Sequence, residues 1–248
     1  MLSTARHAVM RGAERLGIDD QLKYLRALTN PGLRRDLRDH TTFRAIIAAV
    51  VPRDGHTIDV GAHKGDVIAE LVRVAPDGRH IAYEPLPGFA RALRERFPQI
   101  DVREAALSDA AGETTFEYVA NLPGYSGLRR GRLPRDANVK QIRVSLERLD
   151  DTLAEDFRPA FIKIDVNGAE LQVLRGARET ILRHRPVVAF EHGRGFAEVY
   201  GATPAMVHDL LVAECGMRIF DLAGDGPYSR DHFEEVFEQP IWNFVACP

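Results

Sequence analysis

The sequence TIDVGAHKGD, residues 57–66, decides how this chain folds. Apolar residues lead into Val60 and Gly61, which is typical of a buried strand that ends in a tight glycine turn. Gly61 permits close approach of the backbone, and Gly65 allows the next helix to pack near the strand. We expect that helix to begin near Lys64, with unpaired N–H groups and positive potential at its N-terminus. A carboxylate or phosphate group can therefore bind there.

Short apolar runs alternate with amphipathic stretches from His56 onward, which is typical of a parallel sheet with crossover helices. The predicted strands are 56–60, 80–84, 101–105, 116–118, 139–144, 160–164, 186–191, 217–222 and 242–246. The predicted helices begin near 64 and cover 87–97, part of 146–157, 168–184 and 204–214. We therefore expect an α/β domain over residues 56–248.

Residues 1–55 have apolar positions at helical spacing, interrupted by Pro31-Gly32, and predict a helical N-terminal extension. No apolar stretch reaches the roughly 18 residues of a membrane helix, and charges break the first apolar run before a signal peptide could form. The two cysteines suit a reducing compartment. We expect a cytoplasmic protein without a membrane span.

The composition points to small-molecule chemistry. Of the 248 residues, 45% are hydrophobic and 28% charged, as in ordinary globular proteins. The net charge of −3 and a pI near 6.3 provide no global basic field, so we expect no nucleic-acid partner. A homo-oligomer is compatible with the sequence.

Glu84 closes the second predicted strand about 23 residues after Gly61, close to the offset of roughly 20 at which an acid reaches ribose hydroxyls. Its carboxylate can accept two hydrogen bonds from a vicinal diol. Asp59 is expected to orient the turn or to meet a cofactor amino group, directly or through water. Both acids also have a structural interpretation, Asp59 as a cap for the turn and Glu84 as a solvated carboxylate.

Further acidic side chains follow the strands at 160–164 and 186–191. Asp165 ends the first of these strands and should face the crevice in which open α/β sheets bind ligands. Glu170 either acts in catalysis or favours the positive end of the next helix. Glu191 and His192 lie at the same edge of the sheet. His192 can act as a general base near neutral pH, although a single histidine is more often structural.

Together these segments resemble the FkbM family of methyltransferases. The likeness extends from about Thr57 to Cys247, and its most specific part is FIKIDVNGAELQVLRGA at 161–177. The other matching segments are DVGAHKGD at 59–66, YEPLPGFARALRERF at 83–97, EAALSDAAG at 104–112, VVAFEH at 187–192, GMRIFDLAGDG at 216–226 and WNFVACP at 242–248.

The resemblance implies a Rossmann-like class I methyltransferase fold, with a mostly parallel seven-stranded sheet and helices on both faces. It implies S-adenosylmethionine as methyl donor, no metal, and usually a hydroxyl acceptor on a sugar, glycolipid or secondary metabolite. By this likeness Glu84 holds the ribose, and Asp165 lies beside the methyl group and the acceptor. The remaining cofactor residues are Gly61, Ala62, His63 and Gly65 at the methionine end, and Ala106, Leu107, Ser108 and Asp109 at the adenine.

One position departs from the family, which commonly has Glu where this chain has Asn167. Asn167 forms hydrogen bonds but takes no proton. Our hypothesis is that Asp165 or His192 orients or deprotonates the acceptor, with Glu191 in the same catalytic group. The arginine-rich loop at 121–135 either covers the acceptor, binds an anionic group on it, or is simply solvated.

Three other functions share features with this sequence. A nicotinamide-dependent oxidoreductase would have the same fold and Glu84, but it favours the middle glycine of G-x-G-x-x-G, which is missing here. A non-catalytic binding module would keep the fold without turnover, as Asn167 suggests. A nucleic-acid methyltransferase lacks support from the charge and from any Asn-Pro-Pro-Tyr motif or cysteine nucleophile motif.

Overall fold

The computed structural model describes residues 31–131 and 133–248. Two compact units divide the chain, Met1–Ile46 and Ile47–Pro248. The helix α3, Pro31–Val50, begins in the first unit and ends in the second. Its proline occupies the first helical position, where the missing N–H costs nothing. The helical expectation for residues 1–30 lies outside the described residues, and the domain boundary near residue 55 stays a prediction.

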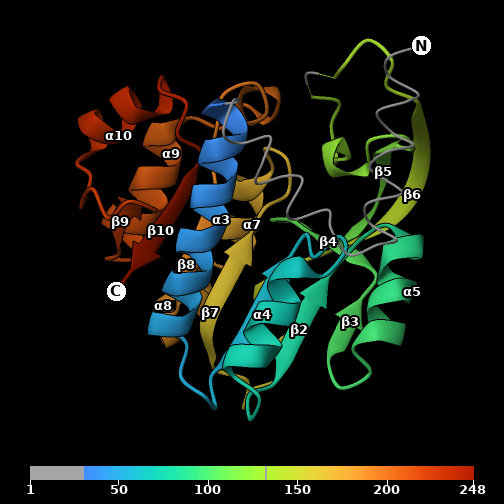
Figure 1. Cartoon of the computed structure of the whole chain (residues 1–248), viewed down its shortest axis with the longest axis horizontal. Coiled ribbons are helices and arrows are strands. Elements are labelled where there is room, and N and C mark those ends of the chain that lie inside the picture. The colour runs from blue at the N-terminus through green and yellow to red at the C-terminus, as the bar shows by residue number, and fades with distance from the viewer. Residues whose placement is uncertain (1–30, 132) are drawn as a thin grey trace. The chain divides into compact units, whose positions relative to one another are not determined.

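A seven-stranded sheet forms the centre of the second unit, in the order β3-β2-β1-β7-β8-β10-β9 (Figure 1). The strands β3, β2, β1, β7 and β8 pair in parallel, and β10 pairs antiparallel with both β8 and β9. The mostly parallel seven-stranded sheet predicted from the sequence is therefore confirmed. The strands are β1 His56–Val60, β2 His80–Tyr83, β3 Asp101–Arg103, β7 Pro159–Ile164, β8 Val187–Glu191, β9 Arg218–Asp221 and β10 Asn243–Cys247.

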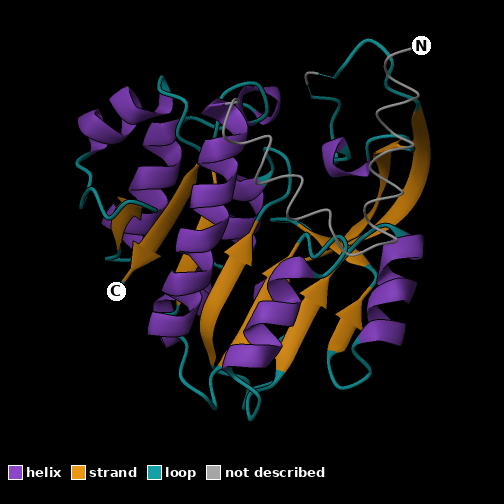
Figure 2. Ribbon diagram, viewed as in Figure 1, coloured by secondary structure: helices purple, strands orange, loops and turns teal. Residues whose placement is uncertain are grey.

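Helices connect these strands, and α4 and α5 lie in front of the sheet in Figure 2. The helix predicted from residue 168 divides at Ala177 into two short helices, and the sequence did not predict α10. In the described part of the chain, no helix has the length and apolar character to cross a membrane. The helices are α4 Asp66–Val74, α5 Pro87–Arg96, α6 Leu149–Thr152, α7 Glu170–Gly176, α8 Arg178–His184, α9 Pro204–His208, the π-helix η3 Asp209–Glu214 and α10 Arg230–Phe237.

A second sheet of three strands has the order β4-β6-β5. Its strands are β4 Ala105–Leu107, β5 Gly112–Val119 and β6 Val139–Glu147. The strand predicted at 101–105 is confirmed for Asp101–Arg103, but its end is wrong, because the chain leaves the large sheet after Arg103 and Ala105 begins β4, which pairs with β6. In Figure 1, β5 and β6 stand beyond the tip of β2. The small sheet can thus wall a site at the carboxyl edge of the large one.

The carboxyl ends of β1 and β7 meet in the middle of the large sheet, where Val60 pairs with Ile164. From β1 the sheet continues through β2 to β3, whereas from β7 it continues through β8 in the opposite direction. Open α/β sheets bind their ligands at such a reversal. The buried residues Ile58, Ile162 and Val188 form a rigid floor below this edge.

Candidate active site

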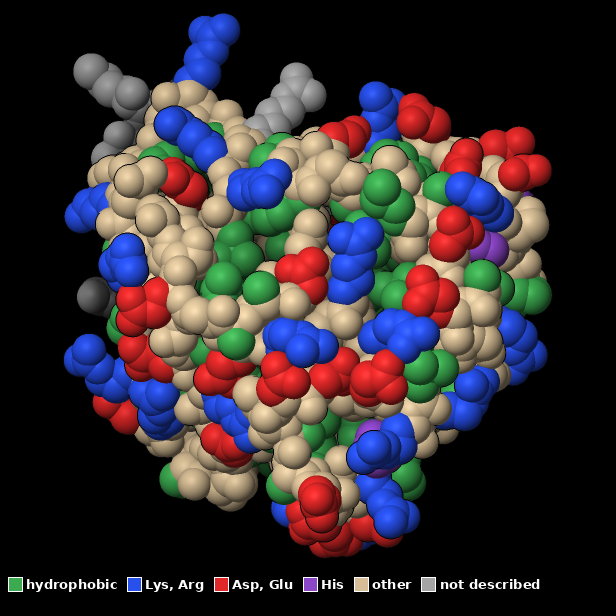
Figure 3. Space-filling view, turned by 180° about the vertical axis from the view of Figure 1, so that it is seen from behind, with side chains coloured by type: hydrophobic (Ala, Val, Ile, Leu, Met, Phe, Trp, Pro, Cys, Tyr) green, Lys and Arg blue, Asp and Glu red, His purple; other side chains and the backbone are tan. Residues whose placement is uncertain are grey.

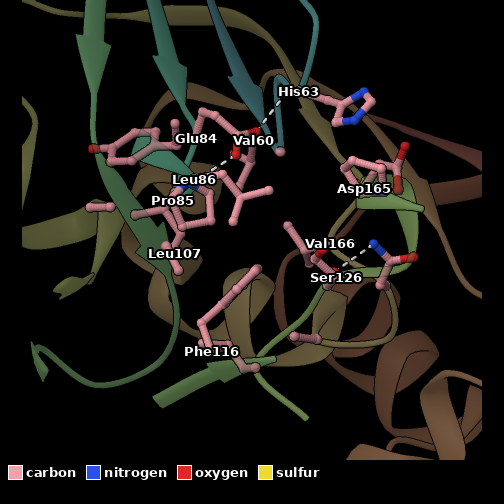
Figure 4. A pocket seen from close by; sticks show the side chains of 18 of the residues that line it. Val60, His63, Glu84, Pro85, Leu86, Leu107, Phe116, Ser126, Asp165 and Val166 are labelled. Carbon is pink, nitrogen blue, oxygen red and sulfur yellow. Dashed lines mark hydrogen bonds between the residues drawn. The ribbon is translucent and has the colours of Figure 1, made fainter. Parts of the chain in front are cut away.

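A pocket opens at the carboxyl ends of β1, β2 and β7 (Figure 4). Its walls come from the ends of these strands, from β4 and β5 of the small sheet, from the segment around the short helix η1 (Pro123–Tyr125), and from the loop after β7. The sequence-predicted residues that line it are Gly61, His63, Glu84, Ala106, Leu107 and Asp165. Among the described residues, no cluster of His, Cys, Asp and Glu could hold a metal ion.

The turn after β1 needs its two glycines for packing. Gly61 has a φ of +76°, and a Cβ there would collide with the backbone carbonyl of Asp165. Gly65 has a φ of +85°, and a Cβ there would press on Leu93 of α5. Only glycine adopts such angles without strain. The turn can therefore lie close to both neighbouring elements, while Ala62 and Gly65 support it from outside the pocket.

Glu84 is the buried carboxylate of the pocket, with 3% of its surface exposed. Its Oε2 accepts a hydrogen bond from the His63 amide at 2.7 Å, and its Oε1 accepts one from the Leu86 amide at 2.9 Å. Burial raises the pKa of Glu84, and these two donors oppose the shift. A carboxylate offers about four lone-pair sites, so each oxygen keeps one for a ligand. This arrangement suits two adjacent ribose hydroxyls.

Asp59 lies beneath the turn, not in the pocket. Its side chain is fully buried, and Oδ1 is 3.1 Å from the Nζ of Lys163. That Nζ also donates to the carbonyl oxygens of Val60 at 3.2 Å and Gly61 at 2.8 Å. Burial alone would lower the pKa of Lys163, but Asp59 and Asp165 outweigh burial and raise it. Asp59 therefore orients the turn through a charged lysine, which the sequence analysis did not single out.

Asp165 follows β7, and Glu191 is the last residue of the neighbouring parallel strand β8, in which Phe190 pairs with Ile164. Asp165 lines the pocket, its side chain is 50% exposed, and its Oδ2 is 3.8 Å from Lys163 Nζ. The Glu191 carboxyl group lies close to that of Asp165. Burial, and then the nearby carboxylates, raise the pKa of Glu191 well above its usual range. Glu191 thus holds a proton that it can share with Asp165.

Glu170 is 1% exposed and closes the loop after β7 from below. Its Oε1 accepts hydrogen bonds from the amides of Val166 and Gly168, both at 3.0 Å. Burial raises the pKa of Glu170 to about 7. Of the two roles considered from the sequence, this geometry favours the structural one, since the carboxyl group is occupied by the loop.

His192 is 1% exposed and lies outside the pocket. Its ring packs on Phe233 and Phe237 of α10, with centroid distances of 6.0 Å and 4.8 Å. Burial lowers its pKa to about 4. Successive side chains of a strand point to opposite faces, so Glu191 meets Asp165 while His192 meets α10. This position does not support His192 as the general base.

The opposite end of the pocket is apolar. Leu107 of β4 and Phe116 of β5 face it together with Leu86, as Figure 4 shows. Ser108 and Asp109 lie outside the pocket, where the serine hydroxyl donates to Asp109 Oδ1 at 3.2 Å. Such walls suit a flat aromatic base, and Phe116 could have been suspected from the alternating pattern of its strand.

Residues around η1 form a wall that the sequence presented only as a loop. Ser126 and Leu128 line the pocket, and Asn167 Nδ2 donates to the Ser126 carbonyl at 3.0 Å. The Tyr200 hydroxyl accepts from the Arg129 amide at 2.8 Å. No signal in the sequence pointed to Tyr200, because it lies in neither a predicted strand nor a motif.

The pocket fits an adenosyl group with an attached amino acid. Glu84 has free lone pairs for a diol, Leu107 and Phe116 offer apolar faces, and the turn at Gly61 leaves room beside Asp165. Comparison with known protein families agrees with a site for S-adenosylmethionine. The model of the Methyltransferase FkbM domain matches residues 59–219, which is more than half of the chain.

Two characterised relatives are methyltransferases by name. Methyltransferase sdnD of Sordaria araneosa is 29% identical over 164 residues, which are 53% of this chain and 63% of that protein. The 2-O-methyltransferase NoeI of Sinorhizobium fredii (strain NBRC 101917 / NGR234) is 26% identical over 171 residues, which are 62% of this chain and 70% of that protein. The chain thus spans less than two thirds of sdnD.

A solved structure has the same fold. Methyltransferase FkbM from Methylobacillus flagellatus KT superposes with a TM-score of 0.50 at 19% identity, over 79% of this chain and 44% of that chain. This likeness supports the class I methyltransferase fold. The family match supports methyl transfer as the chemistry of the family. The chain belongs to the FkbM family of methyltransferases, whose cofactor is S-adenosylmethionine.

Proposed function

We propose that this chain transfers a methyl group from S-adenosylmethionine to a hydroxyl oxygen of a small-molecule or glycan acceptor. The observation that carries the proposal is the half-exposed carboxylate of Asp165, which lines the pocket beside Gly61 and has Glu191 as its partner. The relative NoeI is a 2-O-methyltransferase, which supports oxygen as the acceptor atom.

The donor half of the site comprises Glu84, the turn at Gly61 and the apolar wall. S-adenosylmethionine held there would supply the methyl group, with its thioether sulfur as the leaving group. Glu84 holds the ribose hydroxyls with its remaining lone pairs. Leu107 and Phe116 exclude water from the adenine end. Holding both reactants in line can provide about 7–11 kcal/mol of the barrier reduction.

The acceptor half comprises Asp165, Glu191 and Lys163. Asp165 accepts the proton of the acceptor hydroxyl as the new C–O bond forms, which is typically worth about 10² to 10⁴ in rate. Glu191 shares its proton with the Asp165 carboxylate, and the Lys163 ammonium stabilises the charge from 3.8 Å. Glu191 and Lys163 therefore set the orientation of Asp165 without contacting the acceptor.

A small or neutral acceptor agrees with the charge distribution. On the face shown in Figure 3, acidic and basic side chains lie side by side. Nucleic-acid binding domains usually gather basic residues into one patch or stripe. A glycan or metabolite hydroxyl needs no such field, because carboxylates and amides recognise it by hydrogen bonds.

The direct test is transfer of isotope-labelled methyl from S-adenosylmethionine to a panel of hydroxyl, carboxyl and amine acceptors. The proposal expects label in an alkali-stable ether, and expects Asp165→Asn to lose turnover while it still binds S-adenosylhomocysteine. Label in an alkali-labile ester would indicate carboxyl methylation instead. Donor binding without transfer to any acceptor would favour a binding module and contradict the proposal.

A further inference from the structure

The segment 123–131, which we call the strap, forms one wall of the pocket without belonging to either sheet. Four of its residues line the pocket, namely Pro123, Gly124, Ser126 and Leu128. Opposite side chains that line the same pocket include Asp165 and Asn167 of the loop after β7. The position of the strap therefore decides the width of the pocket beside Asp165.

Asn167 makes the contact between this loop and the strap. Its φ is +55°, a left-handed conformation that asparagine tolerates better than most residues. Its Nδ2 donates to the Ser126 carbonyl at 3.0 Å, as the dashed line beside Ser126 in Figure 4 shows. Ser126 is itself fixed, because its Oγ accepts from the Val119 amide of β5 at 3.0 Å. The amide thus joins the Asp165 loop to the small sheet.

A second contact holds the strap three residues further along. The Arg129 amide donates to the Tyr200 hydroxyl at 2.8 Å, and Arg129 Nη1 donates to the Val199 carbonyl at 3.1 Å. Both partners belong to the short helix η2, Ala197–Tyr200. Between these contacts, Gly127 exchanges two backbone hydrogen bonds with Glu117 of β5, at 2.8 Å and 3.2 Å. The small sheet and η2 therefore hold the strap, and the Asn167 amide adds its link to the loop that carries Asp165.

We propose that Asn167 is a positioning residue that ties the strap to the loop carrying Asp165, and so sets the pocket wall beside the acceptor. The role beside an acceptor rests on the proposed function, whereas the contact between Asn167 and Ser126 does not depend on it. A carbonyl oxygen requires a donor opposite it, and an ionised Asp or Glu has none. Asparagine meets both demands of this position, the backbone angle and the donor.

Three variants separate these demands. Asn167→Asp keeps the size and the tolerance of a left-handed angle but loses the donor. Asn167→Gly keeps the angle and removes the side chain. Asn138→Asp, at an exposed position, introduces the same charge and serves as the matched control. Thermal unfolding checks first that each variant folds.

Hydrogen–deuterium exchange of the strap peptide gives the readout, corrected for intrinsic rates. At pH 8 we expect about 3- to 10-fold faster exchange in both Asn167 variants, as for the loss of one hydrogen bond, and no change in Asn138→Asp. As the pH falls through about 3.9, the ordinary pKa of Asp, the ratio of Asn167→Asp to wild type should fall, because protonated Asp regains a donor. The ratio for Asn167→Gly should stay constant.

Other ionisable groups near Asn167 are present in every variant, and Asn167→Gly shows how the ratio to wild type changes with pH when position 167 carries no carboxyl group. These groups are Asp165 and Glu170 on its own loop, Arg129 on the strap and Tyr200 on η2. A change below twofold at pH 8 in either Asn167 variant would overturn the proposal. So would a ratio for Asn167→Asp that does not move with pH.

Repeating the exchange with saturating S-adenosylhomocysteine separates this inference from the proposed function. In the wild type, we expect the ligand to protect the peptides around Glu84, around Asp165 and in the strap. In the Asn167 variants, the ligand should still protect the peptides around Glu84, and it should protect the strap less than in the wild type. Absence of any ligand effect in the wild type would contradict the proposed function, and the ligand-free ratios would still decide the role of Asn167.

Discussion

The carboxylates in the two halves of the pocket differ in their exposure and in their hydrogen-bond partners. On the donor side, Glu84 is 3% exposed and both of its oxygens accept backbone hydrogen bonds. On the acceptor side, the Asp165 side chain is 50% exposed and lies against a second carboxyl group, Glu191. A carboxylate that the backbone holds in place, with lone pairs left for a ligand, suits binding, whereas a pair whose members differ in environment suits proton transfer. One sheet edge thus provides both a binding half and a reacting half.

The largest effect should come from the reacting half. Asp165→Asn keeps the shape but removes the proton acceptor, so turnover with labelled donor should fall by about 10² to 10⁴. Binding of S-adenosylhomocysteine, measured by calorimetry, should change by less than about threefold, since other residues hold the ribose. Turnover within threefold of wild type would remove Asp165 from the reaction.

The next effect concerns the loop below Asp165. Glu170 has a folded pKa of about 7 against an ordinary 4.5, so the folded state binds the proton more tightly. Its contribution to stability is fully present below pH 4.5 and is lost as the pH rises through 7, by about 3 kcal/mol in total. The free energy of unfolding of Glu170→Gln should therefore improve relative to wild type between pH 5 and pH 8.

Denaturant titrations at both pH values measure that difference. The exposed Glu113 of β5 offers a matched control, because Glu113→Gln should show no pH-dependent gain of this size. If the difference in the free energy of unfolding between Glu170→Gln and wild type is the same at pH 5 and pH 8, then Glu170 is ionised in the folded protein at both pH values.

On the binding half, the effect should be somewhat smaller and should appear in affinity alone. Glu84→Gln replaces a charged acceptor that holds the ribose, and hydrogen bonds to charged groups are worth about 1.5–3 kcal/mol. Calorimetry should show about 10- to 100-fold weaker binding of S-adenosylhomocysteine. Glu113→Gln again serves as the control. Equal affinity in Glu84→Gln and wild type would place the ribose elsewhere.

The smallest effect is expected at His192. Both ring nitrogens lack a hydrogen-bond partner within the described residues, and the ring packs among phenylalanines. His192→Phe should leave turnover within about twofold and should keep or raise the stability by up to about 1–2 kcal/mol, because a buried unpaired polar ring is removed. A hundredfold loss of turnover in a folded variant would restore His192 as a catalytic residue.

Sequence reasoning succeeded where structure is local. The strands around Val60 and Ile164 were predicted within a residue or two, since buried parallel strands are continuous apolar runs that end in recognisable turns. It failed where pairing partners are distant in sequence. The strand at 101–105 looked continuous, yet Ala105 pairs with Ser145 of the second sheet. Nothing near residue 105 indicates that partner.

For the site residues too, sequence reasoning worked where the signal is local and failed where the partner is distant in sequence. Gly61, Glu84 and Asp165 were found because a turn or strand end places them at the sheet edge, and the structure brings all three to one pocket. His192 was expected beside the crevice because its neighbour α10 was not predicted, whereas the structure has its ring outside the pocket. The Asn167–Ser126 contact spans 41 residues and could not be read from either position. Local pattern thus identifies the donor half better than the acceptor half.

The account depends most on the identity of the molecule that the donor half binds. Isothermal titration of the wild-type protein with S-adenosylmethionine, and separately with NAD, tests it directly. We predict one saturable site for S-adenosylmethionine and no detectable heat with NAD. Binding of NAD, or no binding of S-adenosylmethionine at millimolar concentration, would contradict the account.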